Sequence, residues 1–194
     1  MIELLRSILP SNPWLTASVA RVATEPAAIG TLLPAAGRHC GRTPLPHLPG
    51  WRTDDAARVL LLAALPLRGD ALAEEIRSLY RYGDADEKRA VLRGLPWLEV
   101  GDRCVDLVHD ALRTNDTRLV AAALGPYAGH LDDAAWRQGV LKCVFMAIPL
   151  SVVDCLDERA DAELADMLGA LAAERQAAGR AIPDDATALL HRLT

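Results

Sequence analysis

One helix constrains the fold of this chain more than any other stretch. Residues 134–148 form a predicted helix that is apolar on nearly every side, and a helix without a polar face is usually buried. Gln138 and Lys142 interrupt it, and because they are four residues apart they lie on the same face. A buried lysine needs a partner or loses its proton. The stretch therefore predicts a helical protein with polar side chains inside it.

The composition favours an all-α fold. Ala and Leu dominate, and aromatic residues make up only 4% of the sequence, which suits closely packed helices and lacks the runs typical of strands. Caps and helix breakers predict about ten to twelve helices. Residues 1–194 are expected to form a single domain, in which residues 1–50 hold amino-terminal helices and a Gly/Pro-rich connector.

Two all-α architectures fit the pattern. Pro66, Pro96 and Pro126 follow one another at intervals of thirty residues, and each closes a short apolar run. Repeated helix pairs at such a period indicate a stack of the HEAT or armadillo α-solenoid type. An irregular helical bundle is the alternative. In either case, Val59–Leu65 and Val140–Ile148 are expected to be among the most buried segments, because both are almost entirely apolar.

Charge and hydropathy remove several classes of partner. A formal net charge of −5 argues against nucleic acid, because phosphate binding needs a basic face. The longest apolar run, Val140–Val153, contains Lys142 and Pro149 and is too short to be an integral membrane segment. The amino terminus has no basic region of the kind that begins a secretory signal. We therefore expect a cytoplasmic protein whose partner is a small molecule or another protein.

The sequence offers no metal or cofactor site. The motifs GxxxxGK[ST], GxGxxG, HExxH and GxSxG are absent, as is an EF-hand loop. The cysteines, Cys40, Cys104, Cys143 and Cys155, are too widely spaced for zinc and are expected to be buried, reduced thiols. Neither a cofactor nor a metal is predicted.

Lys142 has two interpretations. It is either a structural lysine paired with a buried acid, for which Asp154 and Asp157 are the nearest candidates, or part of a cavity wall that contacts a ligand. If the protein is an enzyme, these same three residues are the candidate acid–base groups. The candidate ligand-binding residues are Arg113, Asn115, Tyr127, Trp136, Gln138, Lys142, Met146 and Arg175.

Polar residues at helix ends have simpler structural explanations. Asp55 and Arg58 are three residues apart on one helix face, where they are expected to pair. Asn115 is expected to cap the amino terminus of a helix, and Arg175 to extend from an apolar stripe or reach a ligand site.

Four strings of the sequence resemble the EboA family. They are WRTDDAARVLLL from Trp51, LRTND from Leu112, PYAGHLDDAAWRQGVLKCVFMAIPL from Pro126 and VVDCLDERADAELADMLGALAAERQAAGR from Val152. The most specific part is W-x-Q-x-x-L-K followed by P-L and L-D-x-R-A. Its positions here are Trp136, Gln138, Leu141, Lys142, Pro149, Leu150, Leu156, Asp157, Arg159 and Ala160. The resemblance covers residues 51–183, with departures at Gly125 and Arg137, where the family has Asn.

The resemblance implies an accessory role in metabolite traffic. Members of this family are encoded with other proteins of a gene cluster and are linked to the handling or export of secondary metabolites, including isoprenoid-derived ones. The expected function is therefore to bind or hand on a small hydrophobic metabolite without catalysis, together with other proteins of the cluster. A cofactor-independent cyclase or isomerase with a polar pocket around Lys142 is the first alternative. A protein–protein adaptor is the second.

Overall fold

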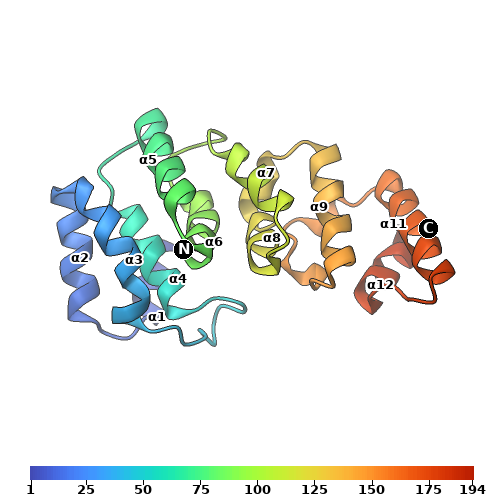
Figure 1. Cartoon of the computed structure of the whole chain (residues 1–194), viewed down its shortest axis with the longest axis horizontal. Coiled ribbons are helices and arrows are strands. Elements are labelled where there is room, and N and C mark those ends of the chain that lie inside the picture. The colour runs from blue at the N-terminus through green and yellow to red at the C-terminus, as the bar shows by residue number, and fades with distance from the viewer. The chain divides into compact units, whose positions relative to one another are not determined.

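The computed structural model describes residues 1–194 and confirms the all-α prediction (Figure 1). It contains twelve α-helices, four short 3-10 helices and no strand, apart from one isolated bridge between Pro44 and Arg52. The chain contacts define two compact units, Met1–Leu107 and Val108–Thr194. The organisation of residues 1–194 as a single domain stays a prediction from the sequence.

Unit 1 is built around one buried helix. Its elements are α1 (Ile2–Ile8), α2 (Pro13–Thr24), η1 (Pro26–Ala28), α3 (Ile29–Cys40), α4 (Thr53–Ala63), α5 (Gly69–Tyr82), α6 (Ala85–Gly94) and η2 (Leu95–Trp97). Helix α4 packs against α1, α2, α3 and α6, while α5 packs against α6. The prediction for Val59–Leu65 is largely confirmed, because only Ala63 and Ala64 in that segment are partly exposed.

The amino-terminal turn of α4 carries charge into the core. Asp54 and Asp55 are both fully buried, and so is Arg58. The expected pair between Asp55 and Arg58 is wrong: Nη1 of Arg58 lies 2.6 Å from a carboxylate oxygen of Asp54, one helical turn away. Nε of Arg58 also donates to the carbonyl oxygen of Leu33 on α3. A buried guanidinium is thus matched by a charge and by a backbone acceptor.

Asp55 pairs with α6 instead. One of its carboxylate oxygens accepts a hydrogen bond of 2.9 Å from Nε of Arg89, and the other lies 2.6 Å from Nη1 of Arg93. The backbone N–H of Arg52 also donates to Asp55, which completes the cap of α4. This carboxylate therefore ties the start of α4 to α6, the helix on which α4 packs most extensively.

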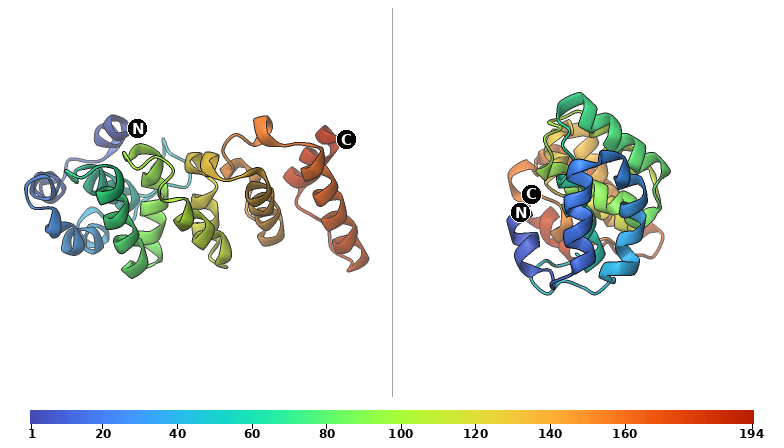
Figure 2. Two further views of the ribbon diagram at one scale, coloured as in Figure 1. Left: turned by 90° about the horizontal axis from the view of Figure 1, so that it is seen from above. Right: turned by 90° about the vertical axis from the view of Figure 1, so that its left-hand side faces the viewer.

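Unit 2 begins within α7 (Val105–Arg113). Its other elements are α8 (Thr117–Ala123), η3 (Pro126–His130), α9 (Asp133–Met146), η4 (Leu150–Val152), α10 (Leu156–Arg159), α11 (Ala162–Ala177) and α12 (Asp184–Leu193). Helix α9 packs against α8, η4 and α11, and α11 packs against α12, the last helix in red (Figure 2). Asp132 caps α9 by accepting from the backbone N–H of Ala135.

The structure corrects two predictions in unit 2. Asn115 does not cap a helix, because Asp116 performs that role for α8. Val140–Ile148 is not buried throughout: Val140, Cys143 and Val144 face the core, but the Phe145 side chain is 67% exposed. The apolar residues on the other side of α9 face an open groove, so an all-round apolar pattern does not require an all-round core here.

The four cysteines differ in how deeply they are buried. Cys104 and Cys143 are buried, and burial raises the pKa of the Cys104 thiol to about 11 and that of Cys143 to about 12. Cys40 is half-buried, and Cys155 is exposed, so the prediction of four buried thiols is wrong for these two. All four are free.

The three prolines that are spaced thirty residues apart each lie shortly after the end of an α-helix. Pro66 follows α4, Pro96 lies in η2 after α6, and Pro126 begins η3 after α8. The HEAT- or armadillo-like character of the stack stays a prediction. No helix combines the length and apolar character that crossing a membrane requires.

Candidate ligand-binding groove

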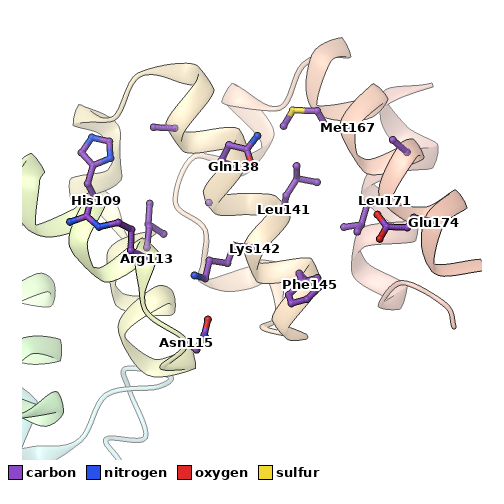
Figure 3. A pocket seen from close by; sticks show the side chains of 14 residues that line it. His109, Arg113, Asn115, Gln138, Leu141, Lys142, Phe145, Met167, Leu171 and Glu174 are labelled. Atoms are coloured by element: carbon purple, nitrogen blue, oxygen red, sulfur yellow. The ribbon is translucent and has the colours of Figure 1, made fainter. Parts of the chain in front are cut away.

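A groove of about 780 Å³ runs over the exposed face of α9, entirely within unit 2 (Figure 3). This volume lies in the range of small-molecule sites, roughly 300–1,000 Å³. Three helices and one connecting residue supply its walls. The lining residues are His109, Leu112 and Arg113 on α7, then Asn115, then Ala135, Gln138, Gly139, Leu141, Lys142 and Phe145 on α9, then Met167, Ala170, Leu171 and Glu174 on α11.

A glycine lets α9 pack closely at the base of the groove. A Cβ added at Gly139 would lie 2.9 Å from Cδ2 of Leu124 and 3.5 Å from Leu112. Because carbon atoms in ordinary contact are about 3.5–4.0 Å apart, only glycine allows this approach without movement of its neighbours. The missing side chain thus lets Leu112 of α7 and Leu124 lie close to the α9 backbone at this point.

Lys142 is partly exposed and has no ion pair or hydrogen bond. Neither of its predicted acidic partners reaches it. The Asp154 carboxylate accepts from the Cys155 thiol at 3.2 Å, and Asp157 forms an ion pair of 2.5 Å with Arg192 on α12. The geometry therefore favours the cavity-wall interpretation of Lys142 over the structural one, and it does not bring Asp154 or Asp157 into the groove.

Polar side chains gather on the α7 side of the groove. The Lys142 side chain extends towards Arg113 and Asn115, and His109 lies on the same side (Figure 3). Arg113 is already partnered, with Nη2 at 3.1 Å from a carboxylate oxygen of Asp110. Lys142 is consequently the uncommitted cation of the groove.

The α11 side is mainly apolar. Leu141 points towards Met167 and Leu171, and Ala170 completes this wall (Figure 3). Glu174 lies on the same helix, one turn after Ala170 in the sequence, and its carboxylate has no partner. The groove thus has a cationic, hydrogen-bonding side and an apolar side bordered by one negative charge.

Arg175 fixes the rim rather than the interior of the groove. Its Nη2 donates to the backbone carbonyl of Phe145 at 2.7 Å, and its guanidinium lies 5.4 Å from the Phe145 ring centroid. A cation near the carboxyl end of a helix is favourable to the helix dipole. Arg175 therefore joins α11 to the end of α9 and holds the exposed Phe145 ring in place.

Tyr127, Trp136 and Met146, which were predicted to bind the ligand, lie outside the groove. Tyr127 is buried beside His130, with ring centroids 4.7 Å apart. Trp136 is 1% exposed, and the Arg159 guanidinium lies 4.8 Å from its ring centroid. Met146 is partly exposed but does not line the groove. Of the predicted set, Arg113, Asn115, Gln138 and Lys142 line it.

Some groove residues were not predicted as such. They are His109, Leu141, Phe145, Met167, Ala170, Leu171 and Glu174. Leu141 and Phe145 carried a usable signal, because they border Gln138 and Lys142 on the same face of α9. The α11 residues carried none, since an apolar stripe that lines a groove has the same spacing as one that lines a core.

The departure from the family pattern at Arg137 lies outside the groove. Nε of Arg137 donates to Asp161 at 3.0 Å, and Nη1 lies 2.8 Å from Glu163. The hydrogen bond from Arg137, helped by the backbone N–H of Leu164, lowers the pKa of Asp161 to about 2. Arg137 thus secures the capped start of α11. Gly125, the other departure, does not line the groove either.

The protein-family model described as metabolite traffic protein EboA matches residues 42–191 of the chain. No curated protein and no solved structure matches the chain.

Proposed function

Because the chain belongs to the EboA family of metabolite traffic proteins, we propose that it binds a small, largely hydrophobic metabolite in the groove over α9 and hands it on unchanged. The observation that carries this proposal is Lys142, a cation without a partner in the wall of an otherwise largely apolar groove. A mostly apolar site with a few convergent polar groups is the usual design for binding a small ligand.

A carrier fits the groove better than a catalyst. Acid–base catalysis requires groups within hydrogen-bonding reach of the same substrate atoms. Asp154 and Asp157, the acids that the sequence offered beside Lys142, are engaged elsewhere, and Glu174 is the only carboxylate that lines the groove. We propose that the receiving molecules are other proteins of the same gene cluster, with isoprenoid-derived secondary metabolites among the candidate cargoes.

The adaptor alternative has less support. An adaptor needs a contiguous exposed apolar surface. Phe145 is the only large apolar side chain exposed in unit 2, and Arg175 holds it at the rim of the groove. This single ring is better suited to covering part of a small ligand than to docking a protein.

Filling the groove tests the proposed function. Ala170→Trp places an indole in the groove, whereas Ala173→Trp places the same side chain on the exposed surface of the same helix outside it. We expect native mass spectrometry and thermal shifts with a panel of hydrophobic metabolites to detect binding to the wild type and to Ala173→Trp. Affinity for Ala170→Trp should fall at least about tenfold, as expected when a ligand loses a well-packed contact. If no metabolite binds, or if Ala170→Trp binds as well as the wild type, the proposal is wrong.

A further inference from the structure

Resting on the proposed function, we infer that the groove takes an amphiphile with a single carboxylate, oriented with the carboxylate at Lys142 and the apolar body against α11. Nothing in the sequence decides between a neutral, a singly charged and a multiply charged ligand. The distribution of charge along the groove does.

The first argument is the number of free cations. Lys142 has no partner, whereas the charge of Arg113 is offset by Asp110, whose carboxylate oxygen lies 3.1 Å away in a largely solvent-exposed pair. A single uncommitted ammonium matches one negative charge. Two further donors, the Asn115 amide and the His109 ring, lie on the same side and complement the two oxygens of a carboxylate (Figure 3).

The second argument is the position of Glu174. Its unpartnered carboxylate lies on the α11 side, where it would repel a second anionic group at the far end of a ligand. The apolar lining residues Leu141, Met167 and Leu171, on the α11 side of the groove, provide a surface for a hydrocarbon body instead. The ligand therefore carries no second negative charge at its far end.

The third argument separates a carboxylate from a diphosphate. Proteins hold diphosphates with several Arg or Lys side chains, with backbone N–H groups at a helix amino terminus, or with Mg²⁺ bound by carboxylates. The groove offers one free ammonium and one carboxylate, and these lie on opposite sides. Such a site favours a monoanion over a group with two or three charges.

A series of probes that differ only in their head group tests the inference. Dodecanoate, methyl dodecanoate, dodecyl phosphate and dodecyl diphosphate share one chain, and each is titrated below its aggregation concentration by calorimetry. We expect dodecanoate to bind about tenfold or more tightly than its neutral ester, because a hydrogen bond to a charged group is lost in the ester. Neither phosphate should bind more tightly than dodecanoate.

Lysine variants identify the residue that binds the charged head group. Lys88 and Lys142 are the only lysines in the sequence, and Lys88 lies in unit 1 over the Tyr80 ring. Lys142→Met should lower dodecanoate affinity to that of the ester without changing ester binding, whereas Lys88→Met should change neither. The inference is overturned if the ester binds as tightly as the acid, if either phosphate binds more tightly than dodecanoate, or if no probe binds. The proposed function fails separately, when no panel metabolite binds or when binding survives Ala170→Trp.

Discussion

Replacing Asp55 with alanine is expected to lower the free energy of unfolding by about 3–5 kcal/mol, the usual cost of removing one partner from a buried ion pair. Asp55 is 0% exposed and receives hydrogen bonds from Arg89, Arg93 and the backbone of Arg52. Without it, the buried Arg89 and the partly buried Arg93 lose their shared counter-charge, and the cap of α4 is lost as well. Urea denaturation followed by far-ultraviolet circular dichroism measures the change.

An exposed aspartate provides the matched control for Asp55. Asp70 forms an ion pair of 2.6 Å with Arg103, but its side chain is 93% exposed. Water screens such a pair, and its removal typically costs no more than about 1 kcal/mol. We expect Asp70→Ala to fall within that limit. A similar loss for both variants would contradict the view that burial, rather than pairing itself, makes the Asp55 contacts indispensable.

The second large effect is expected in unit 2. Trp136→Ala should lower the free energy of unfolding by about 3–5 kcal/mol, as expected for truncating a large buried aromatic side chain. Trp136 also supports Arg159, which donates to the carbonyl oxygens of Ala128 and Leu131 and pairs with Asp133 at 2.8 Å. Loss of the ring would leave that guanidinium without its packing surface.

Two further tryptophan variants sharpen this prediction. The buried Nε1 of Trp136 has no hydrogen-bond partner, so Trp136→Phe removes an unsatisfied donor and keeps most of the packing. It should lose clearly less stability than Trp136→Ala. Trp97→Ala truncates a side chain that is 38% exposed and should also lose less. If Trp136→Ala instead weakened ligand binding and left stability unchanged, Trp136 would be a ligand contact and the assignment to the core would be wrong.

What the sequence predicted well was local. Helices could be placed because their caps and apolar spacing are local: the helix predicted for residues 134–148 is α9, Asp133–Met146, which Asp132 caps. The burial of Val59–Leu62 followed from a run without any polar residue. Gln138 and Lys142 were recognised as one face because the spacing of four fixes their direction on a helix.

What the sequence did not predict depends on packing between distant segments. Arg89 and Arg93 carry no sign that they bind Asp55, which lies on another helix more than thirty residues earlier. The same limit explains α9. Its apolar surroundings predicted a buried Lys142, but whether a helix or a groove covers that face is decided by where α7 and α11 lie, which periodicity does not specify.

The central claim is that Lys142 serves a ligand and not the fold, and one paired measurement tests it most directly. The free energy of unfolding and the affinity for the tightest-binding metabolite of the panel are determined for the wild type and for Lys142→Met. Since Lys142 has no partner in the protein, we predict a change in stability within about 0.5 kcal/mol and an affinity at least about tenfold weaker. A stability loss of about 3 kcal/mol or more with unchanged affinity, as for a broken buried ion pair, would contradict the claim.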